Sequence, residues 1–520
     1  MSLAAGLVAG CSSVSESTAP PLDSEQIVLA EALELGAYNP VAGYGEAGVS
    51  PLYDSLYRPQ ASDDDAVPDL VPALAADVPQ HVAPRRWRVP LRTDVTFSDG
   101  TTFDSADVVA TYRAVKDPVV ASEISTHYAP ITSIAADGPS AVVVDVSTDT
   151  VPTPFLLLGI APSEKVEAAP AADWALNTQP VGTGPYRLES LRPDQAVMVA
   201  RDGYWGEPPE VKRLVYTFTP DDNVRAQRIA ADEVDGVNLP PKLVDSITSD
   251  QVDVVSAKSA DWRGIALPAG NAFTADPTAR RALNIAVDRE AIIADVLAGY
   301  GRRADTPVAA VYGDAFNPDA KFDFDLQRAK SLLDEAGWAL GADGIRAKDG
   351  QKASFELLYN ASDSLRQDLS VAFAAAVKDL GVDVRPRGTS WDEIDTRFGD
   401  SAVLLGGGDA PYSIDSQVYD TLHTRVPDSS PYSNPGNFTA PGLDDLLEQA
   451  RESAPGPARD RIYRDIQSTY VAEPSYVFIA FLDHTYGYRQ LGWNQTAPIL
   501  EPHSHGVAWG PWWHIAAWTR

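Results

Sequence analysis

The sequence has almost no cysteine and few basic residues. Cys11 is its one cysteine among 520 residues, which excludes a disulfide framework, a cysteine-ligated zinc site and a cysteine nucleophile in the folded body. Lys and Arg number 41 against 73 Asp and Glu, so the formal net charge is −32. Such a charge repels nucleic-acid phosphates, so nucleic acid is not expected as a partner. The simplest interpretation of the acidity is a solvated surface that keeps an exported protein in solution.

Several enzyme motifs are also missing. The sequence contains no HExxH helix, no GxSxG turn, no GxxxxGK[ST] loop and no GxGxxG after an expected strand. The run Gly182–Pro185 cannot cradle a phosphate because Pro185 lacks a backbone N–H, and Gly406–Gly408 lacks the lysine of such a loop. We therefore expect a protein that is not an enzyme and needs no cofactor. A secreted glycoside hydrolase stays open as an alternative, because its two carboxylates leave no linear motif.

The N-terminal residues have the pattern of an export signal. A short apolar run, Leu3–Gly10, precedes Cys11, and the polar stretch Ser12–Ser24 follows it. Val8-Ala9-Gly10-Cys11 resembles the lipobox of bacterial lipoproteins, so we expect a lipid on Cys11 and a tether up to residue 25. No Lys or Arg precedes the run, so we expect the signal to begin upstream. The alternative is a small buried cysteine in an ordinary helix.

Length and periodicity predict a two-lobed α/β protein. A chain of 520 residues is too long for one compact core. Alternating apolar residues predict strands near 26–29, 87–91, 142–146 and 214–218. Helices are expected over 105–115, 277–298, 326–337 and 443–452, with Asp104 and Asp276 as N-caps and Gly299 and Gly337 as stops. The later stretch richest in apolar residues, 151–162, is too short to span a membrane and carries three prolines.

Six segments, in chain order, resemble the signature stretches of the family 5 extracellular solute-binding proteins, which include oligopeptide, dipeptide and nickel-chelate binders. Two of them are nearly complete: residues 180–186 read PVGTGPY, and residues 329–338 read AKSLLDEAGW. The others are 87–115 (WRVPLRTDVTFSDGTTFDSADVVATYRAV), 202–205 with 221–237, 280–289 (RRALNIAVDR) and 431–451. The resemblance therefore covers most of the chain after the tether.

The resemblance implies a two-lobed periplasmic-binding-protein-like α/β fold with an extra inserted subdomain and mixed sheets flanked by helices. Lobe I would comprise 26–48, 173–260 and 488–520, with the inserted subdomain over 49–172 and lobe II over 261–487. It further implies the substrate-binding component of an ABC importer, a monomer outside the cytoplasmic membrane, which captures short peptides between its lobes and delivers them to permease subunits. A nickel or other metal-chelate binder and an oligosaccharide binder remain alternatives within the family.

The resemblance also indicates candidate ligand-binding residues. Asp409, in the loop after Gly406–Gly408, corresponds to an aspartate that pairs with a peptide's α-amino group, although it equally suits a turn among glycines. Aromatic walls are expected from Tyr412 and Trp391, for which core packing is the alternative. The cleft rim is expected to begin at Tyr38 and Asn39.

Histidines offer a weaker metal interpretation. His423 lies near Asp409 and would be a metal ligand if the cargo were a nickel chelate, but a lone histidine is more often an ordinary hydrogen-bonded residue. His503 and His505 are two residues apart and invite the same interpretation. We prefer the simpler one, in which the tryptophan-rich C-terminus packs onto lobe I.

Overall fold

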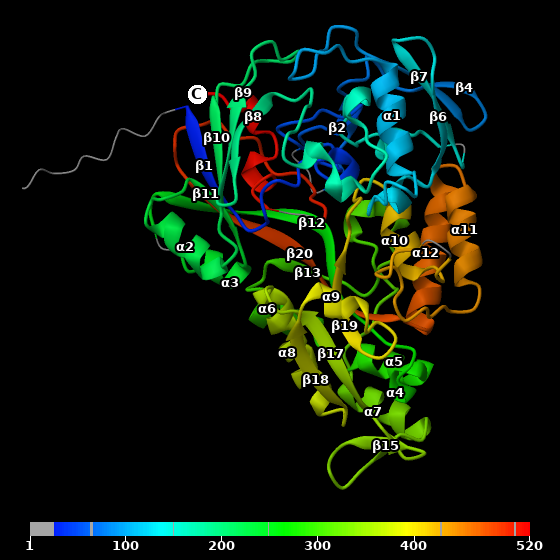
Figure 1. Cartoon of the computed structure of the whole chain (residues 1–520). Helices are drawn as coiled ribbons and strands as arrows, with labels where there is room; N and C mark the ends of the chain where they lie inside the picture. The colour runs from blue at the N-terminus through cyan, green and yellow to red at the C-terminus, as the bar shows by residue number, and fades with distance from the viewer. Residues whose placement is uncertain (1–24, 63–65, 149, 248, 427–428, 504–505) are drawn as a thin grey trace, which may run out of the picture.

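The structure is a computed structural model that describes residues 25–520, except 63–65, 149, 248, 427–428 and 504–505 (Figure 1). The predicted signal segment, Cys11 and nearly all of the tether lie outside the described residues. No helix within the described ranges is long and apolar enough to cross a membrane.

A single mixed sheet connects the two halves of the molecule. Among the described residues it has eleven strands in the order β18-β17-β19-β12-β20-β11-β1-β10-β9-β8, with β13 also paired to β20. The strands are β1 (Gln26–Glu31), β8 (Tyr186–Arg192), β9 (Gln195–Ala200), β10 (Arg213–Phe218), β11 (Gly236–Leu239), β12 (Val252–Ala266), β13 (Gly301–Arg303), β17 (Ser354–Asn360), β18 (Asp383–Thr389), β19 (Ala402–Gly407) and β20 (Tyr476–Arg489).

The long strands β12 and β20 form an antiparallel ribbon that crosses from one lobe to the other (Figure 1). The start of β12 pairs with the end of β20, which also pairs with β11 of lobe I. The other half of β12, Trp262–Ala266, pairs with β19 of lobe II. The register shifts between Lys258 and Trp262, so the ribbon is irregular where the lobes meet. The two-lobed α/β fold predicted from the sequence is confirmed.

Strand β1 begins lobe I and leads directly to the space between the lobes. Ile27 and Leu29 are buried on one face, as the alternation of apolar residues predicts. The strand pairs in parallel with both β10 and β11, which places its last residue, Glu31, at the carboxyl edge of the sheet. Ligands of open α/β sheets bind at this edge.

A smaller subdomain, inserted between β1 and β8, contains an antiparallel sheet and helix α1 (Ser105–Val115). Asp104 and Asp107 form a capping box at the start of α1, and Val108, Tyr112 and Val115 are buried, as expected from the sequence. The sheet order is β4-β5-β7-β6, and β2 pairs with β3 nearby. These strands are β2 (Tyr57–Pro59), β3 (Leu70–Pro72), β4 (Gln80–Ala83), β5 (Arg86–Pro90), β6 (Ile131–Ala136) and β7 (Ala141–Val146).

Most helices belong to lobe II. In chain order the remaining helices are α2 (Asp222–Ala230), α3 (Pro241–Val244), α4 (Ala272–Ala275), α5 (Pro277–Ile285), α6 (Arg289–Val296), α7 (Leu326–Glu335), α8 (Ser364–Lys378), α9 (Trp391–Asp395), α10 (Ile414–Leu422), α11 (Leu443–Glu452) and α12 (Pro457–Ala472). A short hairpin sheet comprises β14 (Ala339–Leu340), β15 (Arg346–Lys348) and β16 (Gln351–Lys352). Of the lobe II helices, α10, α11 and α12 lie beside the inserted subdomain (Figure 1).

The prediction of one continuous helix over 277–298 is wrong. The chain forms α5 and α6 as two helices because Asp288 starts a new one, its carboxylate accepting a hydrogen bond from the Ala291 N–H. The buried Arg289 side chain then donates to the carbonyls of Ala304 and Phe478, which holds the break against β20. The helix stop at Gly299 is confirmed by its positive φ of 85°.

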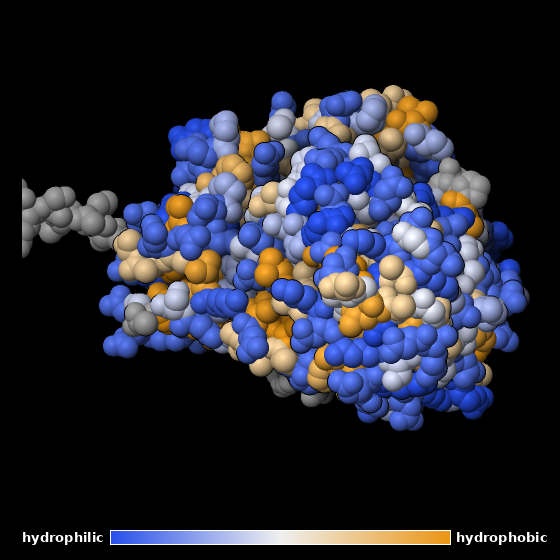
Figure 2. All heavy atoms as spheres, turned by 90° about the horizontal axis from the view of Figure 1, so that it is seen from below, coloured by the Kyte–Doolittle hydropathy of each residue, from blue (hydrophilic) through white to orange (hydrophobic). Residues whose placement is uncertain are grey.

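The lobes touch on either side of the space between them. On one side the Lys242 Nζ lies 3.2 Å from an Asp368 carboxylate oxygen, and the Ser364 hydroxyl donates to Asp222 over 2.8 Å. On the other side residues of the inserted subdomain meet the loop after β19. The structure is therefore a closed form. The face seen in Figure 2 is mostly hydrophilic with small scattered apolar groups, as the acidic composition predicts.

Candidate functional site

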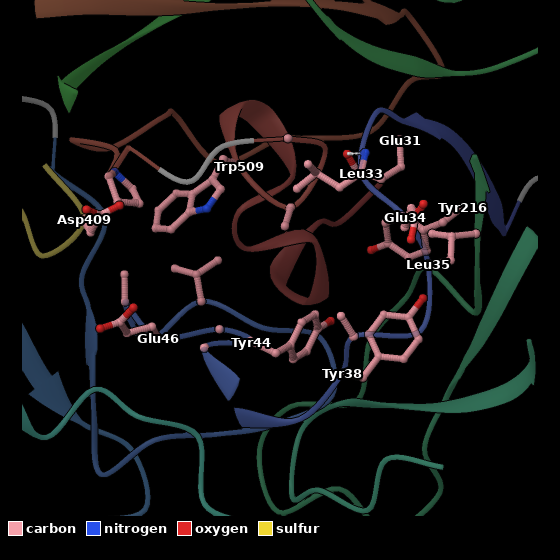
Figure 3. Close-up of a pocket in the computed structure, with 18 of the residues that line it drawn as sticks. Glu31, Leu33, Glu34, Leu35, Tyr38, Tyr44, Glu46, Tyr216, Asp409 and Trp509 are labelled. Carbon is pink, nitrogen blue, oxygen red and sulfur yellow. Dashed lines mark hydrogen bonds between the residues drawn. The ribbon is translucent and has the colours of Figure 1, made fainter. Parts of the chain in front are cut away.

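A cavity of about 250 Å³ lies between the lobes, at the carboxyl end of β1 (Figure 3). Lobe I supplies almost all of its wall, from the segment after β1, from Met198 and Tyr216, and from the C-terminal segment around Trp509. Among the described lining residues only Asp409 comes from lobe II. A molecule that contacts Asp409 and the opposite wall therefore bridges the two lobes.

Aromatic rings form much of the wall. Tyr38 and Tyr44 pack edge to face with their centroids 5.2 Å apart, and Trp509 lies across from them (Figure 3). Tyr216 extends the aromatic surface from β10. Rings of this kind bind apolar groups and cations with little loss of side-chain entropy.

Four carboxylates line the cavity, and they lie at two ends (Figure 3). Asp409 and Glu46 are at one end, and Glu31 and Glu34 are at the other. No Lys, Arg or His is present among the described residues of the lining. The cavity thus carries negative charge at both ends and apolar surface between them.

Glu31 is fixed in place by the backbone that follows β1. Its carboxylate accepts hydrogen bonds from the Ala32 N–H at 2.7 Å and the Leu33 N–H at 3.1 Å. Burial raises the pKa of Glu31, although these bonds oppose the shift. Gly506 passes so close that a Cβ there would lie 3.0 Å from a Glu31 oxygen. The carboxylate is therefore held at the cavity with its charge only partly stabilised.

Glu46, by contrast, has a cationic partner in the inserted subdomain. It forms an ion pair with the His127 ring. Burial opposes the charge on His127, but the Glu46 carboxylate and the more distant Asp409 and Asp420 outweigh it, so the pKa of His127 rises to about 9. This end of the cavity is consequently less negative than its number of carboxylates suggests.

The glycine run before Asp409 allows β19 and its loop to pack closely on β12. A Cβ on Gly407 would lie 2.4 Å from the Trp262 ring, and one on Gly408 would lie 2.3 Å from the Ala260 carbonyl oxygen. Gly408 also has a φ of 113°, which side-chain-bearing residues rarely adopt. These glycines explain how Asp409 is brought from lobe II to the cavity.

Some of the ligand-binding residues expected from the sequence line the cavity and others do not. Asp409 and Tyr38 line it. Tyr412 lines a small adjoining space with Glu46 and His127, and its hydroxyl donates to the Leu500 carbonyl. Asn39 is fully buried and outside the lining.

Asn39 and Trp391 have clear structural contacts. The Asn39 side chain accepts from the Val41 N–H, where it caps a short 3-10 helix, and donates to the Ala171 carbonyl. Trp391 packs edge to face on Tyr432 and lies under the Arg366 guanidinium, away from the cavity lining. Ligand contacts from these two residues stay a prediction, and their geometry favours a supporting role.

The histidine sites have ordinary partners. His423 caps α10, its Nδ1 lies 2.6 Å from the Thr424 carbonyl oxygen, and its ring stacks on Tyr419. Within the described part of the chain, no group of three or more His, Cys, Asp or Glu side chains is arranged to hold a metal ion.

The C-terminal segment packs as predicted, since Trp509, Trp512, Trp513 and Trp518 share the lobe I core with Ile27.

His505 lies outside the described residues, and His503 joins an ionic network at the irregular part of the β12–β20 ribbon. In it His484 Nε2 lies 3.1 Å from Asp261 and its Nδ1 lies 2.7 Å from Glu501. His503 and Arg263 contact the other Asp261 oxygen.

This network holds charge in the protein interior. Asp261, Glu501 and His484 are almost fully buried. Burial disfavours the charged ring, but hydrogen bonds to Asp261 and Glu501 outweigh burial and raise the pKa of His484 to about 9. Burial likewise opposes the charge on Asp261, but Arg263 and the histidines hold its pKa well below the usual range. His484 and His503 line a second space of about 430 Å³ between the lobes.

Sequence reasoning missed the three glutamates, Tyr44, Trp509 and His127. Glu31, Glu34 and Glu46 occur in a chain with 73 acidic residues, so composition does not distinguish them. A signal was present in the segment between β1 and the inserted subdomain, where tyrosines and glutamates alternate with glycines. That pattern is typical of a binding loop at the edge of a sheet.

Comparison with known proteins places the chain among transport proteins. Residues 69–429 match the family model described as bacterial extracellular solute-binding proteins, family 5 middle. Protein XP55 of Streptomyces lividans is 34% identical over 93% of this chain and 89% of its own length. The nickel-binding periplasmic protein of Escherichia coli is 27% identical (83% and 84%), and the oligopeptide-binding protein AppA of Bacillus subtilis is 26% identical (67% and 69%).

Solved structures share the fold. NikZ from Campylobacter jejuni, in complex with Ni(L-His), superposes with a TM-score of 0.84 at 23% identity and covers 96% of this chain and 100% of its own. AppA from Bacillus subtilis, in complex with a nonapeptide, gives 0.78 at 20% identity, with 95% and 98% covered. The two-lobed architecture is therefore common to proteins with different cargo.

Proposed function

Since this chain belongs to the bacterial extracellular solute-binding proteins of family 5, we propose that it captures short peptides between its lobes and delivers them to a membrane permease. The family role is that of the substrate-binding component of an ABC importer, acting outside the cytoplasm. Peptide is the proposed cargo because one relative is named for binding oligopeptides and because the cavity suits a short chain.

One observation carries this proposal: Asp409, whose side chain is exposed, is the only lobe II residue among the described residues of the cavity lining. A peptide α-amino group would form a charge-assisted hydrogen bond with this carboxylate. The rest of the peptide then contacts the lobe I wall around Tyr38, so binding favours the closed form. The cavity volume of about 250 Å³ favours two or three residues over a long peptide.

The proposal includes a location and partners. We infer that a lipid on Cys11 anchors the protein at the outer face of the cytoplasmic membrane, as a monomer that meets permease subunits in its closed form. Two or more acyl chains on one cysteine anchor a protein stably to a membrane, whereas a single chain does not. Globomycin treatment of expressing cells, followed by mass spectrometry of the N-terminal peptide, tests whether Cys11 is processed as a lipoprotein.

Asp409→Asn tests the peptide proposal. We expect this variant to bind short peptides about 10- to 100-fold more weakly, because a charge-assisted hydrogen bond contributes about 1.5–3 kcal/mol. Isothermal titration with amidated alanine dipeptides and tripeptides measures the affinity. N-acetylation of the same peptides removes the α-amino charge and should weaken binding to the native protein by a similar factor.

The control is Asp400→Asn, which changes an exposed aspartate of lobe II outside the cavity lining. It should bind like the native protein. Equal affinities of Asp409→Asn and the native protein would contradict the α-amino contact. Native mass spectrometry of the protein as purified separates the other outcomes: a retained nickel complex or oligosaccharide, or turnover of an added glycoside, would replace the peptide proposal.

A further inference from the structure

The cavity has carboxylates at both ends, although one α-amino group needs only one. Asp409 and Glu46 lie at the first end, and Glu31 and Glu34 lie at the second (Figure 3). Because the first end already has His127 paired to Glu46, it has one carboxylate, Asp409, for a cationic group of the ligand. The carboxylates at the second end are separate from the first, so a ligand that fills the cavity would contact them with another of its groups.

The charge at the second end has no ion-pair partner among the described residues. Glu31 accepts hydrogen bonds from the Ala32 and Leu33 N–H groups, and the Val507 backbone also lowers its pKa. Arg225 lowers that pKa as well, but its guanidinium is occupied by Asp222 and by backbone carbonyls. Glu34 is exposed at the mouth. Burial of Glu31 costs free energy while it is charged, and a bound cation would recover part of that cost.

A second observation points to a ligand at this end independently of the acids. Tyr38 is only 6% exposed, and its hydroxyl makes no hydrogen bond of good geometry with a described residue, although the Gly36 backbone lies close enough to oppose the rise in its pKa. Tyr38 lines the cavity, and its hydroxyl points toward Glu34 and Leu35 (Figure 3). A buried hydroxyl without a partner costs free energy, so a donor from the ligand would satisfy it. An ammonium or guanidinium group donates several hydrogen bonds and suits Tyr38 and Glu31 together.

The wall between the two ends fits an aliphatic chain. Tyr44 and Trp509 present ring surface between Asp409 and Glu31 (Figure 3). The methylene groups of Lys or Arg pack against such surface while the charged group reaches polar atoms. No described lining residue is basic, so a C-terminal carboxylate finds no cation in the cavity.

We propose that the cargo is a dication: a short basic peptide whose α-amino group pairs with Asp409 and whose Lys or Arg side chain reaches Glu31, Glu34 and the Tyr38 hydroxyl. This inference rests on the proposed peptide function and narrows it to one substrate class. Neutral and acidic peptides are then poor cargo. Selection arises because the carboxylates repel negative side chains and remain unpaired with neutral ones.

Four amidated dipeptides test the inference: Lys-Ala, Ala-Lys and their norleucine counterparts, in which an aliphatic chain replaces the ammonium group. Amidation removes the carboxylate. By isothermal titration we expect at least one lysine peptide to bind about tenfold more tightly than its norleucine counterpart, the ratio that one charge-assisted hydrogen bond supplies. The preference should shrink as salt is raised, because the mouth is partly exposed.

Two variants test whether Glu31 and Glu34 recognise the lysine side chain. Glu31→Gln keeps an oxygen acceptor for the Ala32 and Leu33 N–H groups, and Glu34→Gln changes an exposed side chain, so both variants should fold. We expect the double variant that carries both Glu31→Gln and Glu34→Gln to lose most of the preference for lysine peptides. Its affinity for norleucine peptides should stay within about twofold of the native affinity, because only the cation contact is lost. Glu164→Gln, an exposed glutamate outside the cavity, is the matched control and should keep the preference.

The outcomes separate this inference from the peptide function. If norleucine peptides bind as tightly as lysine peptides, or the double variant keeps the preference, the dication inference is overturned and the peptide function stands. If no dipeptide binds but 1,5-diaminopentane does, and the double variant abolishes that binding, the dication inference stands and the peptide function fails. If neither dipeptides nor the diamine bind, both are contradicted.

Discussion

At the scale of single residues, the position of Asp409 depends on glycines more than on the aspartate itself. Asp409 follows Gly407 and Gly408, whose missing side chains let β19 and its loop pass against Trp262 and Ala260. The sequence predicted Asp409 because its neighbourhood resembles a known loop. It could not predict Glu31 or Glu46, because their role depends on a wall assembled from β1, β10 and the C-terminal segment, which are far apart in the chain.

Gly408→Ala tests this dependence. The new Cβ would lie 2.3 Å from the Ala260 carbonyl oxygen, so the loop has to shift and Asp409 moves with it. We expect weaker peptide binding and a loss of stability about 1–3 kcal/mol larger than that of Gly100→Ala, the cost typical of overpacking. Gly100 is the matched control because its φ of 92° is also positive but its Cβ would meet nothing within 4 Å. Urea unfolding and calorimetric titration measure the two effects, and equal losses in the two variants would contradict a steric role for Gly408.

At the scale of elements, helix N-caps could be predicted from the sequence, but breaks between consecutive helices could not. Asp104 and Asp276 start helices as predicted, since an aspartate before a helical pattern satisfies N–H groups locally. The break between α5 and α6 was missed because the apolar pattern continues through it, whereas the buried Arg289 needs carbonyls from β20 and from the segment after β13. Trp391 and Asn39 were predicted from sequence position alone, and the packing around each one decides its contacts.

The irregular part of the β12–β20 ribbon contains the His484 network, which should make the free energy of unfolding depend on pH. His484 has a pKa of about 9 in the folded chain against 6.5 as its ordinary value. A raised pKa contributes stability that is fully present below pH 6.5 and is lost as the pH rises through about 9. We therefore expect His484→Gln to flatten the fall in the free energy of unfolding between these values, by up to about 1.4 kcal/mol per pH unit.

His514 provides a control of opposite sign. Burial lowers the pKa of His514 to about 4, so its contribution is present above pH 6.5 and is lost as the pH falls toward 4. His514→Gln should change the stability profile only on the acidic side, and His484→Gln only on the basic side. Urea unfolding at half-unit steps from pH 4 to about pH 9.5 measures both profiles, and an unchanged basic slope in His484→Gln would show that the network carries no titrating proton in this range.

At the scale of the whole molecule, the fold was predictable because many weak sequence signals agree. The segments that resemble the solute-binding proteins are spread from residue 87 to residue 451, and the family model matches 69–429. The cargo was not predictable in the same way, since relatives with this architecture are named for nickel and for peptides. In the proposed function, cargo choice depends on which side chains face a cavity of about 250 Å³, a small part of the molecule. The predicted limits of the lobes and of the inserted subdomain stay a prediction.

In the proposed function, a cargo favours closure of the lobes because both lobes contribute to the cavity. Lobe I supplies the aromatic wall and three glutamates, whereas lobe II supplies Asp409. Surface contacts such as Lys242 with Asp368 contribute little, because exposed ion pairs stabilise by only about 0–1 kcal/mol. The hydrogen bond from the Tyr412 hydroxyl to the Leu500 carbonyl is a buried contact between the lobes, and the proposed cargo adds a second link by joining Asp409 to the lobe I wall.

Small-angle X-ray scattering with and without bound peptide tests this account most directly. The protein stripped of cargo should have a larger radius of gyration, and saturating it with the tightest-binding lysine dipeptide should lower that radius as the lobes close. Asp409→Asn at the same peptide concentration should stay expanded. Identical scattering profiles of the free and the saturated protein, with saturation verified by calorimetry, would contradict the claim that the cargo joins two lobes.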